Sequence, residues 1–381
     1  MRPARPAFAA LRSPGLRIAC VYRRDRLPHF RLTRMSSIRF VRMAQAFAHR
    51  GHRVDIVLNH RRRPETLGPG LREIPFRFAR WEDYDVVKTF FHAGFESLVA
   101  EGGGDHPYIV SKLGSVVGGE DRPGVYFFGG VREGLFRIQQ EIARSSRAVT
   151  VLTEESAALW RDVHGPDVSL LRVPTGVDAE IPPLGPNPYA ALGIERPVAL
   201  FAGNLYSRMQ QPEVNLLWQD RLNRVGRVLK RLGITLVAIG SGDTDRIDRD
   251  SVLHLGEIDA HSVWDWQRHA RVGLVLAQGP TQHNESSKIY YYLRTGLPVV
   301  CERPVPNAWL IGKTGLGTIV DYDDAEALAE AVAALAKRTP AANGVIDYMI
   351  AAHSWDQRAA LYDPVFRAAL AERREANRDR A

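Results

Sequence analysis

The segment from Leu16 to Leu58 restricts the possible folds most. It runs from a short apolar stretch, LRIACVY, through SSIRFVRMAQAFAHR to a second apolar stretch, RVDIVL. Apolar residues in the middle stretch recur at helical spacing, Ser36 or Ser37 can cap that helix, and Gly51 suits its left-handed end. Two strands joined by such a helix lie parallel, with a right-handed crossover. The start of the chain therefore predicts an α/β domain.

The same alternation continues to the end of the chain. Apolar stretches at 84–91, 107–113 and 147–153 predict further buried strands, and 136–146 predicts a helix. A second series begins with VALFAGNL, and 381 residues exceed one ordinary core. We therefore expect two doubly wound, Rossmann-like domains with parallel sheets that face a central cleft. The predicted divisions are a disordered leader at 1–15, a first domain at 16–180, a Pro- and Gly-rich linker at 181–197, a second domain at 198–352, and a C-terminal helix at 353–381 that packs back on the first domain.

Composition indicates a globular protein, with 45% hydrophobic and 25% charged residues and no apolar run near the roughly 18 residues that span a bilayer. Cys20 and Cys301 lie in apolar stretches and are interpreted as free buried thiols, which fits a reducing cytoplasm. The net charge of +8 does not by itself indicate nucleic acid, because the basic and aromatic residues do not form the pattern of any known nucleic-acid-binding module and no helix-turn-helix or RNA-binding signature occurs. The basic stretch at 22–42, with Arg61 to Arg63, predicts either contact with an anionic membrane surface or phosphate-bearing substrate, or a solvated face.

Ligands of such sheets bind at the carboxyl ends of strands, where helix N-termini attract phosphate. Gly203 follows a predicted strand, Asn204 comes next, and Arg208 in the same loop can reach a phosphate. Gly240 ends another strand in VAIGSGD. Neither spacing is a dinucleotide or P-loop fingerprint, so an ordinary turn is the alternative at both places.

The stretch HNESSKIYYYLRTGLPVV, His283 to Val300, reads as a polar loop, a short helix, a glycine turn and a strand. Asn284 and Ser286 can cap the helix. Lys288 falls in its first turn, where the helix dipole disfavours a cation, so a bound anion is one interpretation and a solvated lysine the other. Three consecutive tyrosines cannot all face one side of a helix.

The first half offers candidates for proton transfer. His92 follows a predicted strand and titrates near neutrality, although a structural histidine is equally consistent. Glu120 and Asp121 lie in a Gly-rich loop, and Glu133 lies in the stretch FFGGVREGLFR. Each carboxylate is either a catalytic base or a loop charge.

The chain resembles glycosyltransferases of the two-Rossmann GT-B fold, of the family 4-like group. Four stretches carry the resemblance in the family's order: SSIRFVRMAQAFAHRGHRVDIV, VTVLTEESAALW with VSLLRVPTGVD, VALFAGNL, and SSKIYYYLRTGLPVV. The resemblance implies transfer of a sugar from a UDP- or GDP-linked donor to a saccharide or lipid-linked acceptor in polysaccharide or glycolipid synthesis. It also implies no bound metal or other cofactor. The cysteines and the basic stretch at 22–42 lead us to expect a cytoplasmic location, free or peripheral at the inner membrane face.

Site residues follow from the same resemblance. Lys288 would contact the diphosphate, Gly203 would line its approach, Arg208 is a looser match, and Glu285 is the nearest candidate for the donor ribose. The predicted catalytic residues are His92, Glu120, Asp121 and Glu133, with no metal ligands. The predicted donor-binding residues are Gly203, Asn204, Arg208, Gly240, His283, Asn284, Glu285, Ser286, Ser287, Lys288 and Tyr291.

Two departures separate this chain from the common retaining members. The glutamate that they carry five residues before the turn glycine is Tyr291 here, and the glutamate eight residues earlier is His283. Keeping Lys288 while losing the glutamate resembles the xanthan-type glucuronosyltransferases, which invert and would use an acid of the first domain as base. A binding protein of this fold without turnover, or a nucleotide-sugar 2-epimerase, is the alternative.

Overall fold

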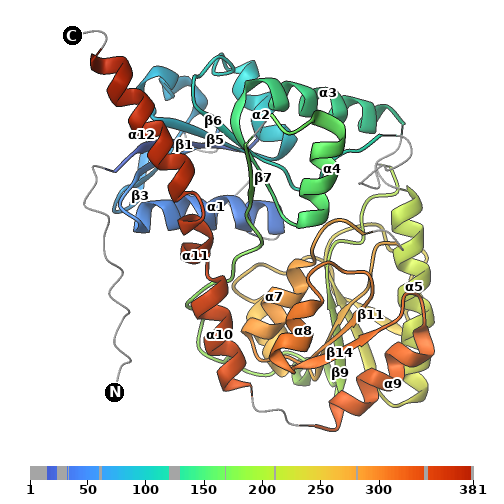
Figure 1. Ribbon diagram of the computed structural model, residues 1–381. Coiled ribbons are helices and arrows are strands. Elements are labelled where there is room, and N and C mark those ends of the chain that lie inside the picture. Colours follow the sequence, from blue (N-terminus) through green and yellow to red (C-terminus); the bar gives the residue numbers. More distant parts are fainter. Residues whose placement is uncertain are drawn as a thin grey trace.

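The computed structural model describes residues 15–23, 32, 34–59, 62–119, 129–167, 169–209, 212–279, 282–338 and 342–378. Two α/β domains lie one above the other (Figure 1), each built on its own sheet. The predicted pair of doubly wound domains is confirmed. The predicted leader at 1–15 lies almost wholly outside the described residues, as do Glu120 and Asp121.

The N-terminal sheet contains eight strands among the described residues, in the order β3-β4-β2-β1-β5-β6-β7-β8. Every neighbouring pair is parallel except the edge hairpin of β3 and β4, which the sequence did not predict. The strands are β1 Arg17–Val21, β2 Arg53–Val57, β3 Glu65–Gly68, β4 Leu71–Ile74, β5 Val86–Phe90, β6 Ile109–Lys112, β7 Ser146–Val151 and β8 Ser169–Arg172.

Helices cover both faces of this sheet (Figure 1). Apolar side chains of α1, α11 and α12 form the core on one face, and those of α2, α3 and α4 form it on the other. The C-terminal end of the chain therefore packs on the N-terminal domain, where Phe47 meets the Tyr362 ring edge-on at 5.1 Å. The bounds are α1 Met35–His49, α2 Phe91–Ala100, α3 Gly129–Ser145, α4 Glu154–His164, α11 Trp355–Ala360 and α12 Asp363–Arg378.

The C-terminal sheet has six strands in the described part of the chain, all parallel, in the order β11-β10-β9-β12-β13-β14. Helices α5 and α9 pack on one face, and α6, α7, α8 and α10 on the other. The strands are β9 Val198–Ala202, β10 Thr235–Ile239, β11 Val252–His254, β12 Val272–Val275, β13 Val299–Glu302 and β14 Gly317–Val320. The helices are α5 Pro212–Arg231, α6 Val263–His269, α7 Ser287–Arg294, α8 Trp309–Thr314, α9 Ala325–Ala336 and α10 Asn343–His353.

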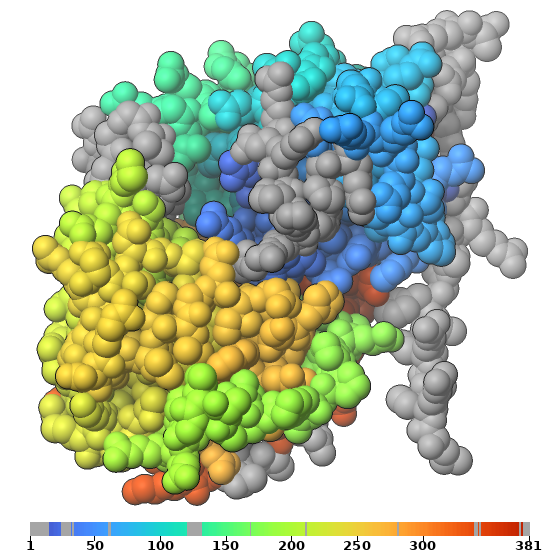
Figure 2. Space-filling view, turned by 180° about the vertical axis from the view of Figure 1, so that it is seen from behind, coloured from blue at the N-terminus to red at the C-terminus, as the bar shows by residue number. Residues whose placement is uncertain are grey.

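The chain passes between the domains twice, and the two passages are bonded to each other. The Val177 amide donates to the His353 carbonyl at 2.8 Å, and the Trp355 amide donates back to the Val177 carbonyl at 3.1 Å. The Pro- and Gly-rich segment that follows the first passage lies over the C-terminal domain, in green in Figure 2. There the Gly185 amide donates to Asp265 at 2.9 Å and the Tyr189 hydroxyl to the Trp266 carbonyl at 2.6 Å, so this segment is anchored to α6.

The structure confirms some of the local predictions and contradicts others. Gly51 has the expected positive φ, 90°, directly after α1. The predicted caps Ser36 and Ser37 are wrong, because α1 begins at Met35 and places both inside its first turn. Cys20 and Cys301 are free and buried, as predicted. Among the described residues, no helix is long and apolar enough to cross a membrane.

Candidate functional site

Two glycines bring the ends of β9 and β10 into close contact. The Gly203 amide donates to the Ile239 carbonyl at 2.8 Å. A Cβ on Gly240, whose φ is +147°, would lie 1.9 Å from the Gly203 carbonyl oxygen. The strand ends can approach this closely only because Gly240 lacks a side chain.

Lys288 packs directly against this glycine contact. It lies in the first turn of α7, and a Cβ on Gly203 would lie 2.5 Å from its Cε. Its ammonium sits 4.8 Å from the centroid of the Phe201 ring, and within the described residues it forms no ion pair. Burial lowers the pKa of Lys288 to about 8. A cation and a helix N-terminus beside a glycine without a shielding side chain suit a phosphate.

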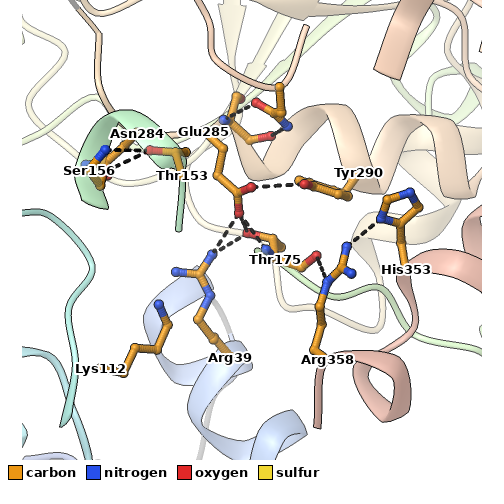
Figure 3. Close-up of polar contacts among 12 residues, drawn as sticks. Arg39, Lys112, Thr153, Ser156, Thr175, Asn284, Glu285, Tyr290, His353 and Arg358 are labelled. Atoms are coloured by element: carbon orange, nitrogen blue, oxygen red, sulfur yellow. Dashed lines mark hydrogen bonds and ion pairs between the residues drawn. The ribbon is translucent and has the colours of Figure 1, made fainter. Parts of the chain in front are cut away.

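The loop before α7 reaches across to the N-terminal domain (Figure 3). The His283 carbonyl accepts a hydrogen bond from the Thr153 hydroxyl at 2.6 Å. The Asn284 amide donates to the Ser115 hydroxyl at 2.6 Å, and its carbonyl oxygen accepts from Ser156 at 3.2 Å. The loop that the sequence assigned to the donor therefore also bridges the two domains.

Glu285 makes the most buried of these bridging contacts, with 2% of its side chain exposed. One carboxylate oxygen accepts from the Thr175 amide at 2.5 Å and from the Thr175 hydroxyl, and the other accepts from the Tyr290 hydroxyl at 2.9 Å. The Arg39 guanidinium lies 4.0 Å away. Both oxygens are thus engaged inside the protein, so a ribose contact by Glu285 stays a prediction that requires this arrangement to change.

Ser286 and Ser287 begin α7 but do not cap it. Ser286 is the N-cap residue, yet its side chain makes no capping hydrogen bond. Its backbone is held by Asn307 instead, which accepts from the Ser286 amide at 2.7 Å and donates to its carbonyl at 2.9 Å. Asn307 therefore fixes the start of the helix that carries Lys288.

The three tyrosines of α7 point in different directions, as expected, but all three are buried. Tyr290 faces Glu285, and Tyr292 inserts under β9, where its hydroxyl donates to the Leu200 carbonyl at 3.1 Å. Tyr291 stacks on Trp264 with ring centroids 5.4 Å apart. Burial raises the pKa of the Tyr291 hydroxyl, so this side chain stays neutral where common family members carry a carboxylate.

Asn204 and Arg208 follow Gly203, and Asn204 binds within its own loop while Arg208 binds the loop after β10. The Asn204 side chain accepts from the Tyr206 amide at 2.9 Å. Arg208 is half-exposed and forms an ion pair with Asp245, and its amide donates to Asp243 at 2.7 Å. The charge of Arg208 is therefore already compensated.

The catalytic candidates of the N-terminal domain are not brought together. His92 lies in the first turn of α2, and its buried Nε2 has no hydrogen-bond partner in the described part of the protein. Burial lowers the pKa of His92 to about 4, with a smaller opposing effect from Gln139 of α3. Glu133 is exposed on α3, and Glu120 and Asp121 lie outside the described residues.

Four further polar residues at the domain contact were not predicted from the sequence. Arg39 of α1 donates to the Thr175 hydroxyl, and Arg358 of α11 donates to the Thr175 carbonyl at 3.0 Å. Lys112 ends β6 beside Arg39 (Figure 3). Only Lys112 left a signal in the sequence, as a lysine inside the apolar stretch PYIVSKL.

Solved structures show what this architecture is similar to. Sucrose-phosphate synthase from Thermosynechococcus elongatus is 15% identical, with 94% of this chain and 100% of that chain covered and a TM-score of 0.67. The UDP-forming α,α-trehalose-phosphate synthase from Burkholderia vietnamiensis is 12% identical over 94% and 98% of the two chains, with a TM-score of 0.63. HepE from Anabaena, solved with UDP and glucose, is 12% identical over 95% and 100%, with a TM-score of 0.59.

No family model matches the chain, and no curated protein matches it in sequence. At identities this low, the structural likeness defines the fold. The chain has the GT-B fold of glycosyltransferases over nearly its whole length, and the predicted fold is confirmed.

Proposed function

We propose that this protein is a glycosyltransferase that binds a nucleotide-sugar at the C-terminal domain and transfers the sugar to an acceptor held by the N-terminal domain. The observation that carries the proposal is the position of Lys288. Among the described residues, it combines a cation without an acidic partner, the N-terminus of α7 and the half-buried backbone of Gly203 at the carboxyl ends of parallel strands. This combination stabilises a diphosphate leaving group.

The structural neighbours favour a UDP-linked donor over a GDP-linked one. HepE was solved with UDP-glucose, and the trehalose-phosphate synthase is described as UDP-forming. We propose a hexosyl or glucuronosyl donor and an acceptor in polysaccharide or glycoconjugate synthesis. Lys288 and the α7 dipole, without a metal ion, would offset the charge of the diphosphate, so transfer should persist in EDTA.

The replacement of a glutamate by Tyr291, with Lys288 kept, favours the inverting xanthan-type chemistry over retention. An inverting transfer needs a base that takes the proton of the acceptor hydroxyl. His92 has a buried, unpartnered Nε2 within the described residues and is neutral at pH 7, so it is one candidate, beside Glu120, Asp121 and Glu133. Proton NMR of the product formed from an α-linked donor would decide the stereochemistry.

The test of donor binding is calorimetry with UDP, GDP and ADP and their glucose esters. Lys288→Ala should weaken binding about ten- to a hundred-fold, the worth of a hydrogen bond to a charged group. Lys230→Ala is the matched control, because Lys230 is an exposed lysine of the same domain. Equal affinity of the two variants would remove Lys288 from the site, and no nucleotide binding at all would end the proposal.

A binding protein without turnover is the second candidate. It is favoured by the engagement of Glu285 with Thr175 and of Arg208 with Asp245, which leaves both side chains occupied within the protein. Release of UDP from UDP-sugars, measured with and without saccharide acceptors, separates the two functions. Donor binding with no UDP release from any donor would favour this second candidate.

We also propose a peripheral association of the cytoplasmic protein with anionic membranes, through the basic stretch of 22–42, apart from the buried Arg39, and through Arg61 to Arg63. Part of this stretch lies outside the described residues. Co-sedimentation with phosphatidylglycerol vesicles should be strong at low salt and fade as ionic strength rises. Binding that salt does not weaken, or no binding at low salt, would contradict an electrostatic association.

A further inference from the structure

Two lysines are buried on neighbouring strands of the N-terminal sheet, but the protein provides them with different numbers of hydrogen-bond acceptors. Lys88 of β5 is fully buried, and Lys112 of β6 is 1% exposed. The Lys88 ammonium donates to the Thr89 and Val110 carbonyls and to the Thr150 hydroxyl, at 3.4, 3.2 and 3.4 Å. These three acceptors match the three N–H groups of an ammonium.

Lys112 has only one such acceptor in the described part of the chain, the Leu113 carbonyl at 3.0 Å. Its ammonium also lies 5.9 Å from the centroid of the Phe91 ring, and two of its three N–H groups have no hydrogen-bond acceptor among the described residues. A buried ammonium with incomplete hydrogen bonding is costly unless a ligand or counter-charge completes it.

The neighbour that Lys112 faces is another cation. Figure 3 shows its ammonium end pointing toward the Arg39 guanidinium. Arg39 is itself 6% exposed, and its buried Nε has no partner among the described residues. Burial, followed by the Arg39 charge, holds the pKa of Lys112 well below its usual range. Each of these two adjacent buried cations thus has N–H groups without a hydrogen-bond acceptor among the described residues.

The local charge is positive even when Glu285 is counted. Arg39, Lys112 and Arg358 form what we call the buried cation cluster, and each feels the Glu285 charge. Among the described residues, Glu285 is the one carboxylate that acts on all three, and its two oxygens accept hydrogen bonds from Thr175 and Tyr290. The cluster therefore carries an excess of two positive charges when all three cations are protonated.

We propose that the buried cation cluster binds a phosphate group of the acceptor, with Lys112 and Arg39 as its direct contacts. This inference rests on the proposed function, since it names the acceptor class of that enzyme. A phosphate dianion matches the excess of charge and offers several acceptor oxygens to the guanidinium and the ammonium. Because the loop at 283–285 bridges the domains over this region, the domains must part to admit the ligand.

The test is calorimetric titration with inorganic phosphate in the Lys288→Ala variant, which removes the donor-site cation. Lys112→Met in that background should weaken phosphate binding about ten- to a hundred-fold. Lys88→Met is the matched control and should weaken phosphate binding much less than Lys112→Met, because the hydrogen bonds of Lys88 are made within the protein and only its charge acts on Lys112. No phosphate binding, or equal losses in both variants, would overturn the proposal.

Thermal melting guards against misfolding as the explanation. Lys112→Met replaces an incompletely hydrogen-bonded buried amine by an apolar side chain of similar length, so it should melt at or above the temperature of the parent. Lys88→Met also removes three hydrogen bonds, so it should melt no higher than Lys112→Met. A phosphate site lost from a protein of unchanged melting temperature supports the proposal. If Lys112→Met loses phosphate binding and also melts at a lower temperature, Arg39→Lys provides the second test. This variant keeps the charge but loses the planar guanidinium, so it should still weaken phosphate binding. Unchanged phosphate affinity in Arg39→Lys would overturn the role of Arg39.

Two further arms identify the carrier of the phosphate. Binding of glucose 6-phosphate is compared with binding of glucose. Binding to phosphatidylcholine vesicles that contain about 20% phosphatidic acid is compared with binding to pure phosphatidylcholine vesicles. Preference for the sugar phosphate, dependent on Lys112, supports a soluble acceptor, and Lys112-dependent preference for the phosphatidic acid vesicles supports a lipid-linked one. If the protein prefers neither the sugar phosphate nor the phosphatidic acid vesicles, the assignment to an acceptor is overturned. UDP binding is measured separately and tests the proposed function by itself.

Discussion

The carboxylate of Glu285, on the loop before α7, accepts a hydrogen bond from the backbone amide of Thr175 at 2.5 Å. Thr175 belongs to the passage that leaves the N-terminal sheet, so this bond joins the two domains at a buried point. The same carboxylate lies 4.0 Å from Arg39, and it begins the segment that carries Lys288. A change at Glu285 should therefore affect both the stability of the domain contact and the position of the donor loop.

Glu285→Gln should lower the free energy of unfolding by about 1.5–3 kcal/mol, because it removes the charge from hydrogen bonds to a buried carboxylate. It also leaves Arg39 without its nearest anion. Urea denaturation followed by tryptophan fluorescence measures the effect. Glu326→Gln is the control, since Glu326 pairs with Arg231 at the exposed surface and should change nothing measurable. Equal stability of the two variants would show that the Glu285 contact does not hold the domains together.

Gly203→Ala should lower UDP affinity, whereas Gly240→Ala should lower the stability of the fold. A Cβ on Gly203 meets the flexible end of Lys288, which can move aside, so the fold should persist while UDP affinity falls about ten-fold. A Cβ on Gly240 meets backbone at 1.9 Å in a conformation with φ of +147°. Gly240→Ala should therefore cost about 1–3 kcal/mol or more of stability. Thermal melting and calorimetry distinguish the two, and wild-type UDP affinity in Gly203→Ala would contradict a phosphate contact by Lys288.

UDP affinity should decrease at alkaline pH. Burial lowers the pKa of the Lys288 ammonium to about 8 in the free protein, and a bound diphosphate raises that pKa because it favours the charged form. The cation is therefore present below pH 8, and binding must be accompanied by proton uptake above it. Between pH 7 and pH 9.5 the affinity should fall about ten-fold, as a shift of one pKa unit corresponds to a factor of ten. The decrease should vanish in Lys288→Met, and a pH-independent wild type would be inconsistent with this role.

The fold could be predicted from the sequence because its signals are local. Strands such as Arg17–Val21 are buried on both faces and read as apolar runs, and Gly51 marks the end of the first helix. The edge hairpin of β3 and β4 escaped prediction because Glu65–Gly68 is largely exposed and carries no apolar pattern. The rule that strand ends of a parallel sheet meet at one edge selected the loops of Lys288 and Gly203, and the family resemblance placed both residues at the diphosphate.

The rest of the site depends on contacts between distant parts of the chain. Glu285 has no local feature that predicts its bonds to Thr175, 110 residues earlier. Arg39 reads as an ordinary residue of an amphipathic helix until α11 and the loop of Glu285 enclose it. Tyr291 was identified as a departure from the family pattern, but its stacking on Trp264 requires the packed domain.

The paired passages at Val177 and Ser354 have a mechanical consequence. Two flexible links at separate places would let the halves of the molecule twist and slide independently. Here the links are hydrogen-bonded to each other, and the second continues into helices that are packed on the opposite half. Relative motion is thereby limited mainly to a hinge rotation about one axis through the two passages. Any change that separates Glu285 from Thr175 should therefore rotate the two domains apart about that axis.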